Sequence, residues 1–153
     1  MSGHVKGVQA RILEVEPRAV YTHCSNHVLN LALQDGTESN KFLQGALEIA
    51  HETGKLFNES AKRVNILETV AAEHETEMLT VKPLCKTRWT VRHHSLDHIL
   101  RQYGILIEAL EEVSTLDSCR GQDVSVKAAG LVVMMRNTTT YFALCVARCV
   151  RSL

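Results

Sequence analysis

The stretch VYTHCSNHVLNL at residues 20–31 constrains the fold most, because strand character there runs directly into a helical pattern. Residues 19–23 favour a strand, and a Cys-x-x-His follows, formed by Cys24 and His27. Ser25 is suited to cap the next helix, since its hydroxyl can accept a hydrogen bond from a first-turn N–H group. We therefore expect Cys24 and His27 at the junction of a strand and a helix. In open α/β sheets, sites are usually built at this edge.

Composition and charge exclude several classes of protein. The chain has 153 residues, which corresponds to one domain or a piece of one. Its 17 basic and 17 acidic side chains cancel, so any electrostatic partner must be met by a local patch. Five irregularly spaced cysteines favour a reducing compartment over a disulfide framework. No signal peptide and no run of about 20 apolar residues is visible. We expect an intracellular protein, nuclear or cytoplasmic, without membrane contact.

Apolar side chains recur every three or four residues through most of the chain, which predicts amphipathic helices. The pattern places them at residues 2–13, 25–34, 41–77, 96–113 and 126–153. Pro17 ends the first helix, Asp35-Gly36 ends the second, and Gly54 is the expected point of a kink or split in the third. Residues 114–125 are expected to form a loop, and the last segment forms one helix or two.

A single strand cannot form a sheet, because its backbone groups need partners. Residues 19–23 give the one convincing strand. Either a second strand lies near Leu79 to Val81, or the chain is a fragment of a larger domain. The expected fold class is therefore predominantly α with a residual α/β unit.

One local stretch is basic and contains an aromatic residue. No carboxylate occurs between Glu77 and Asp97, and Pro83 marks a break between helices. The basic and aromatic side chains of this stretch are Lys82, Lys86, Arg88, Trp89 and Arg92. Basic side chains with an aromatic residue among them are a candidate patch for nucleic acid.

Several groups of residues, in this order along the chain, resemble the hAT superfamily of transposases. They are MSG and GVQ at 1–3 and 7–9, HCSNHVLNL at 23–31, FNES and KR at 57–60 and 62–63, and KTRW at 86–89. More narrowly, they resemble the domesticated copies known as zinc finger MYM-type protein 1-like proteins and as repressors of the inhibitor of the protein kinase. Residues 129–144 resemble the start of the helical insertion that those proteins carry. The resemblance covers nearly the whole chain.

The resemblance implies a fragment of an RNase H-like transposase core that runs into an all-helical insertion domain. Residues 1–89 then correspond to part of the core, a helix-strand-helix plus long helices, and residues 90–153 to the start of the insertion. Complete enzymes of this family cut and join DNA with three carboxylates that hold divalent ions such as Mg²⁺. All three carboxylate positions of the family fall outside residues 1–153, as do its zinc finger and its dimerisation segment. The aspartates that do not sit at motif positions are Asp35, Asp97, Asp117 and Asp123. The resemblance thus implies a chain that is not an enzyme, with no catalytic residue, bound metal or cofactor.

Cys24 and His27 match the Cys-x-x-His of the family and are interpreted as vestigial neighbours of an active site. There the histidine can hydrogen-bond a scissile phosphate while the cysteine packs beneath it. A second interpretation is a capped helix start with a buried thiol. A third is a zinc site completed by Cys85 with His93 or His94, although this spacing matches no common zinc finger. Cys145 and Cys149 share a helix face and favour a core or interface pair over a metal site.

Arg88 and Trp89 match the Arg-Trp pair of the family. In a complete enzyme the indole would stack on a flipped base and the guanidinium would hold a phosphate. The alternative has Trp89 packed in the core as an anchor for the following helix, with Arg88 in solvent.

We therefore expect a catalytically incomplete transposase-derived chain, with residual non-specific DNA contact at most. The residues expected to make that contact are Lys82, Lys86, Arg88, Trp89 and Arg92. The alternative is a module for protein interaction or self-association, in which exposed helix stripes bind a protein partner or a second copy. A zinc-binding module is the third interpretation.

Overall fold

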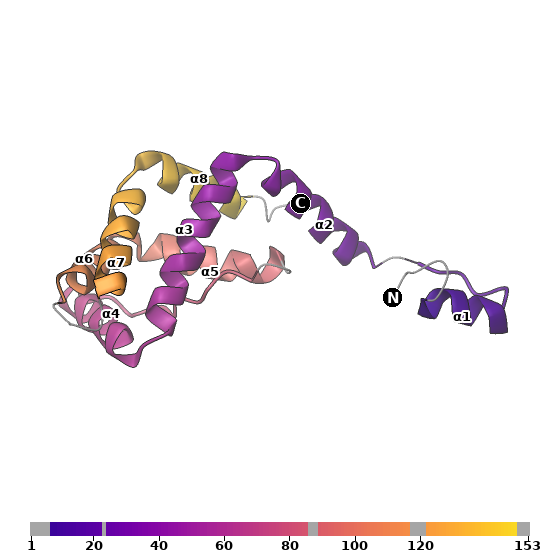
Figure 1. The fold of residues 1–153 in the computed structure, drawn as a ribbon, viewed down its shortest axis with the longest axis horizontal. Helices are drawn as coiled ribbons and strands as arrows, with labels where there is room; N and C mark the ends of the chain where they lie inside the picture. Colours follow the sequence, from indigo (N-terminus) through magenta and orange to yellow (C-terminus); the bar gives the residue numbers. More distant parts are fainter. Residues whose placement is uncertain (1–6, 23, 86–88, 117–121, 150–153) are drawn as a thin grey trace. The chain divides into compact units, whose positions relative to one another are not determined.

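The computed structural model describes residues 7–22, 24–85, 89–116 and 122–149, with the backbone alone at positions 26, 38, 89–91 and 122. The chain divides into two compact units, residues 1–32 and residues 33–153. The described helices are α1 (Val8–Val15), α2 (Ser25–Glu38), α3 (Lys41–Asn58), α4 (Ala61–Glu73), α5 (Trp89–Arg101), α6 (Tyr103–Thr115), α7 (Gln122–Met135) and α8 (Thr138–Cys149) (Figure 1). None of them is long and apolar enough to cross a membrane.

The expectation of a predominantly α chain is confirmed, whereas the described ranges contain no strand. Residues 19–22, where we expect the strand, lie outside any regular element and are largely exposed. An extended segment becomes a strand only when a neighbouring segment supplies backbone partners. Residues 79–81, the candidate second strand, belong to the other unit and bond to side chains instead. The α/β unit and the RNase H-like core are therefore not shown.

The N-terminal unit contains α1 and the beginning of α2. α1 ends at Val15, ahead of Pro17 as expected, and none of its residues is buried. α2 begins at Ser25, and the carbonyl of Cys24 accepts a hydrogen bond from the amide of His27 (2.9 Å). Cys24 therefore occupies the position before the first turn that we expect for Ser25.

α2 continues through Asp35-Gly36, where we expect it to end, as far as Glu38. The next helix has a well-defined start. The side-chain oxygen of Asn40 accepts hydrogen bonds from the amides of Phe42 (3.1 Å) and Leu43 (3.2 Å). Such a cap satisfies two of the first-turn N–H groups that a helix leaves without internal partners. The break between α2 and α3 therefore comes just before Asn40 rather than at the glycine.

The single helix expected at residues 41–77 is in fact two helices, and it does not break at Gly54. That glycine lies buried in the interior of α3, which runs on to Asn58. α4 starts at Ala61, with Ser60 in the extended conformation of an N-cap. The break comes one turn after the glycine, so the expected kink at Gly54 is wrong.

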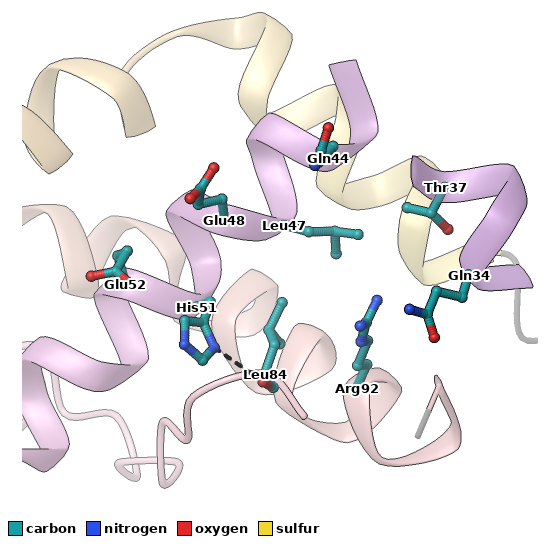
Figure 2. Close-up of a pocket in the computed structure, with 9 residues that line it drawn as sticks. All are labelled: Gln34, Thr37, Gln44, Leu47, Glu48, His51, Glu52, Leu84 and Arg92. Atoms are coloured by element: carbon teal, nitrogen blue, oxygen red, sulfur yellow. Dashed lines mark hydrogen bonds between the residues drawn. The ribbon is translucent and has the colours of Figure 1, made fainter. Parts of the chain in front are cut away.

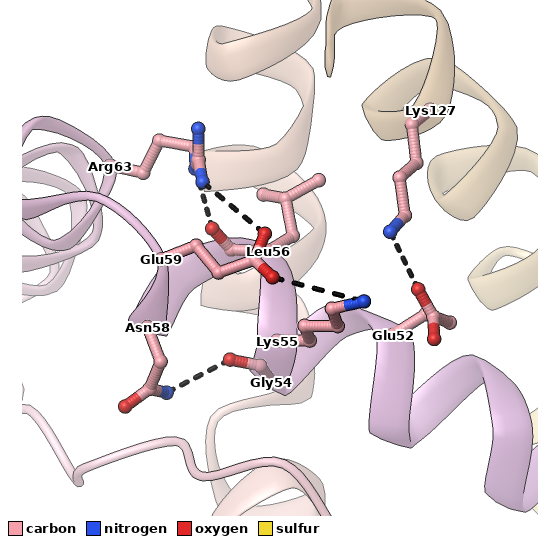
Figure 3. Close-up of polar contacts among 8 residues, drawn as sticks. All are labelled: Glu52, Gly54, Lys55, Leu56, Asn58, Glu59, Arg63 and Lys127. Carbon is pink, nitrogen blue, oxygen red and sulfur yellow. Dashed lines mark hydrogen bonds and ion pairs between the residues drawn. The ribbon is translucent and has the colours of Figure 1, made fainter. Parts of the chain in front are cut away.

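Polar contacts around the α3–α4 turn hold the two helices together (Figure 3). Nε of Arg63 donates to the backbone carbonyl of Leu56, near the end of α3. Glu59 pairs with Arg63 (3.9 Å) and with Lys55 (3.8 Å). The last carbonyls of a helix have no intrahelical partner. At the end of α3, the carbonyl of Leu56 receives one from Arg63 of α4.

The helix expected at residues 96–113 is likewise two helices, α5 and α6, separated at Gln102. Gln102 is 2% exposed, and its amide group is used by another segment rather than by solvent. α6 ends at Thr115, two residues later than expected, and α7 begins at residue 122, inside the expected loop. The tail forms two helices, and the side chain of Asn137 accepts from the amide of Thr139 (2.9 Å) at the start of α8.

The body of residues 33–153 is a helix-on-helix core. α6 packs against α4 and α7, while α8 packs against α3 and α5. The largest fully buried side chains include Leu56, Phe57, Leu67, Leu96, Ile99, Leu106, Leu110 and Leu144. This core fixes α3 and α5, the two helices between which the candidate site is built.

Candidate functional site

An extended segment, residues 78–85, lies between α3 and α5; we call it the strap. Val81 and Leu84 bury their side chains in the core, and several backbone carbonyls of the segment accept hydrogen bonds from side chains. The side chains that bond to these carbonyls are Gln102 at Leu79, His98 at Thr80, Asn58 at Val81, His51 at Leu84 and Arg92 at Cys85. Gln102 also accepts from the amide of Leu79 (3.2 Å). Buried backbone groups need partners, and here side chains supply what a neighbouring strand would supply in a sheet.

Gly54 allows the strap to approach α3 closely. A Cβ added at this position would lie 2.7 Å from the carbonyl carbon and oxygen of Lys82 and 2.8 Å from the nitrogen of Pro83. One turn later, Nδ2 of Asn58 donates to the carbonyl of Gly54 (2.8 Å; Figure 3) and to that of Val81. The backbone at Lys82 is therefore fixed against α3, while its side chain is exposed.

The last two residues of the strap are fixed by two side chains from different helices. Nδ1 of His51 lies 3.0 Å from the carbonyl of Leu84. Because a carbonyl can only accept, this contact requires the proton on Nδ1. From the first turn of α5, Nε of Arg92 donates to the carbonyl of Cys85. Both bonds therefore lie directly before Lys86 in the sequence.

A pocket of about 300 Å³ lies beside the end of the strap. Figure 2 shows the side chains that line it, namely Gln34, Thr37, Gln44, Leu47, Glu48, His51, Glu52, Leu84 and Arg92. Nζ of Lys127 lies 2.5 Å from Glu52, and this hydrogen bond holds the pKa of the Glu52 carboxyl below its usual value. With Glu48 beside it, the lining has carboxylates as well as the guanidinium of Arg92. A lining of mixed sign does not favour a phosphate group.

The structure places only part of the predicted DNA-binding set. Lys82 is exposed at the surface, and Arg92 is half-buried beside the pocket. Lys86 and Arg88 lie outside the described residues, and of Trp89 only the backbone, at the start of α5, is described. The alternative of a core-packed Trp89 therefore stays a prediction, as does its stacking on a base.

The predicted Cys-x-x-His lies on the surface of the N-terminal unit. Cys24 and His27 are both exposed, so the interpretation of Cys24 as a buried thiol is wrong. In the part of the chain that the structure describes, no three histidine, cysteine or acidic side chains are arranged to hold a metal ion. Cys145 is half-buried and Cys149 is exposed on α8. A role for either pair beyond packing stays a prediction.

Comparisons with known proteins find distant relatives, among them the human and mouse forms of one repressor. The chain is 25% identical to the human 52 kDa repressor of the inhibitor of the protein kinase over 118 residues, which cover 74% of this chain and 15% of that protein. It is 28% identical to the mouse protein of the same name over 121 residues, which cover 76% and 16%. The chain thus spans about one sixth of the length of the curated relatives it matches. No family model and no solved structure matches it. These matches support a distant relationship to that repressor.

Sequence reasoning missed the side chains that hold the strap. His51, His98 and Gln102 are single polar residues within helical patterns, and no motif marks them. Asn58 lies in the FNES group at 57–60, but that resemblance does not indicate a contact with another segment. One feature of the sequence could have indicated that such side chains exist. Pro83 excludes a helix, and an extended segment between packed helices must find partners for its carbonyls.

Proposed function

We propose that this chain is a non-catalytic part of a transposase-derived protein and that it contacts DNA weakly, without sequence preference. The residues proposed to make the contacts are Lys82, Lys86, Arg88, Trp89 and Arg92, which all belong to the basic stretch. The observation that carries the proposal is the fixed position of the strap, which holds the backbone of Lys82 within this stretch and that of Cys85 directly before Lys86. The similarity to a repressor also supports a role without catalysis.

Electrostatics support a phosphate ligand at this place. No carboxylate lies between Glu77 and Asp97, and the first turn of α5 has no acidic residue. The N-terminus of a helix carries partial positive charge and free N–H groups, which favour an anion. Stacking of Trp89 on an unpaired base would add about 1–3 kcal/mol, so single strands are the preferred ligand. No metal or cofactor is needed for this contact.

A fluorescent oligonucleotide tests the proposal by anisotropy. We expect binding at low ionic strength that weakens steeply as salt rises, because phosphate contacts release counterions. The triple variant K82Q/K86Q/R88Q should bind more weakly, and its salt slope on duplex DNA should be smaller by up to about 0.9 for each lost contact.

The matched control for this measurement removes the same number of charges elsewhere. Arg11, Lys41 and Lys62 are exposed and lie outside the basic stretch. The variant R11Q/K41Q/K62Q should keep most of the affinity and the slope of the wild-type chain. Equal losses in both triple variants, or an absence of salt-sensitive binding in the wild-type chain, would show that the proposal is wrong.

A protein-interaction or self-association module is the second candidate, and α7 and α8 favour it. Their exposed apolar side chains are Val126, Val133, Met134, Tyr141 and Phe142. Val133 is 72% exposed and Phe142 is 63% exposed, and the two helices pack against each other, so these side chains offer apolar area that a partner could cover. Sizing the purified chain by light scattering separates the candidates, since a dimer that DNA does not change favours self-association.

A further inference from the structure

α7 carries a narrow apolar stripe on the side that faces away from the core. Because a helix repeats every 3.6 residues, positions 126, 129, 130 and 133 lie on one side and the buried positions lie on the other. Val126 is 70% exposed, Val133 is 72% exposed, and Ala129 between them is also exposed. The buried side chains of the helix are Ala128, Leu131, Val132 and Met135. The inner side of α7 is therefore already packed, and the stripe is open to another chain.

The middle of the stripe is small enough for a second helix to approach its backbone. A Cβ added at Gly130 would meet no atom within 4 Å, apart from its chain neighbours and the nearby backbone of its own helix. Ala129 beside it has only a methyl group. The distance between packed helices depends on the side chains at their contact, so these two residues are suited to a close crossing.

The stripe is self-complementary in sequence. Val126 and Val133 lie at equal distances on either side of the midpoint of residues 129–130. Asp123 and Arg136 lie at equal distances beyond the two valines and carry opposite charges. In a symmetric dimer, residue i of one copy contacts residue j of the other, and the reverse. A two-fold axis at this midpoint would therefore place valine against valine at the centre and Asp123 of each copy near Arg136 of the other.

The two charged residues are available for such contacts. Asp123 is exposed, and within the described ranges it makes no ion pair. The side chain of Arg136 is 63% exposed and pairs with Glu111 of α6. A guanidinium has five N–H donors, so Arg136 can bind a second carboxylate without leaving Glu111. Asp123 and Arg136 lie on opposite flanks of the stripe, so the two helices must cross obliquely for both pairs to form.

We propose that the chain forms a symmetric dimer in which α7 of one copy crosses α7 of a second copy, antiparallel, over residues 129–130. This inference rests on the self-association candidate and gives it a surface, and it is independent of DNA contact. A single crossing of two helices buries a small area, and small interfaces are typical of weak complexes. The dimer should therefore form reversibly as the concentration of the chain rises.

A pair of charge-reversed chains tests this arrangement. In Asp123→Arg, both ends of the crossing bring two arginines together, and in Arg136→Asp they bring two aspartates together. Each variant alone should dimerise about tenfold more weakly than the wild-type chain, because two attractive pairs become repulsive. A mixture of the two variants restores opposite charges at both ends, so a mixed dimer should form with nearly the wild-type affinity. Sedimentation velocity, with one variant fluorescently labelled in the mixture, measures the dissociation constants.

The mixture also controls for effects within one chain. Arg136→Asp removes the ion pair with Glu111 and places a carboxylate beside it. Mixing does not alter that contact. Recovery of the dimer in the mixture therefore reports pairing between chains and not the state of the α6–α7 contact.

A larger side chain at the crossing point gives a second test. Gly130→Gln adds a long uncharged side chain where space is open, so the thermal midpoint should stay the same or rise, while the dimer weakens by about tenfold or more. Gly45→Gln is the matched control, because Gly45 lies on α3 and also has open space around an added Cβ. It should dimerise like the wild-type chain.

The outcomes separate this inference from the candidate on which it rests. A wild-type chain that stays monomeric up to about 1 mM would overturn both self-association and the α7 crossing. A chain that still dimerises as Gly130→Gln, or whose charge-reversed variants do not recover in the mixture, would keep self-association on another surface and overturn the crossing. Recovery in the mixture, together with loss in Gly130→Gln, supports the crossing whether or not the chain binds DNA.

Discussion

At the scale of single residues, Gly54 has less room for a side chain than the other glycines of the described helices. Alanine at this position would put a Cβ 2.7 Å from the backbone of Lys82. That backbone cannot retreat easily, because Asn58 bonds to the carbonyl of Val81 beside it. We expect Gly54→Ala to lower the free energy of unfolding by about 1–3 kcal/mol, as overpacking does, in spite of the higher helix propensity of alanine. Urea unfolding followed by circular dichroism measures the change.

Gly45, on the same helix, provides the control. Apart from its chain neighbours and the nearby backbone of its own helix, no atom lies within 4 Å of a Cβ added there, so Gly45→Ala should leave stability unchanged or raise it by up to about 1 kcal/mol. A stabilised Gly54→Ala chain would show that the strap does not lie against α3. The sequence singled out Gly54, but as the point of a kink or split in the helix. The structural reason for a glycine here is the close approach of a segment about thirty residues later, and the local spacing of residues does not show it.

At the scale of elements, helix starts differ in how well they are capped. Asn40 bonds to two amides at the start of α3, whereas Ser60 before α4 makes no capping hydrogen bond through its side chain. We therefore expect Asn40→Ala to cost about 1 kcal/mol of unfolding free energy and Ser60→Ala to cost much less. Thermal and urea unfolding of both variants compare the two starts. Equal costs would contradict this assignment of caps.

The periodicity of apolar residues predicts where helices form but not where one helix ends and the next begins. The spacing of apolar residues correctly indicated helices over most of the chain. It ran across the breaks near Ser60 and at Gln102, because the apolar stripe continues on both sides of each break. What ends α5 is a contact: Gln102 bonds to Leu79, 23 positions earlier. The extent of helix could be predicted, but the turns that build the strap and its pocket could not.

The candidate site also has a part that the sequence predicts and a part that it does not. The basic stretch is contiguous, so Lys82 and its neighbours could be found by reading charges in order. His51 and Leu84 are 33 positions apart, and only packing of α3 against the strap brings them together. A strand was expected at residues 19–23 from local propensity alone, but strand formation depends on a partner that this propensity does not report.

At the scale of the whole molecule, the two units differ in how many apolar side chains they bury. The hydrophobic core lies entirely within the body of residues 33–153, whereas α1 contributes no buried residue. Val8, Ile12 and Val15 of α1 are exposed by 51% or more. Stability depends chiefly on the apolar area removed from water, so the N-terminal segment contributes little to the stability of the body.

A chain that lacks residues 1–24 tests this division. It keeps all of α2, including Thr37, which is buried in the body unit. We expect its midpoint of thermal unfolding to lie within about 2–4 °C of that of the full chain, since a loss of about 1 kcal/mol shifts a domain of this size by that much. Circular dichroism measures both midpoints, and the loss of helical signal should match α1 alone. A larger fall, with a broader transition, would mean that the N-terminal unit packs on the body and completes its core. The expected small change would leave the exposed apolar side chains of α1 available to another chain, as the protein-interaction candidate requires.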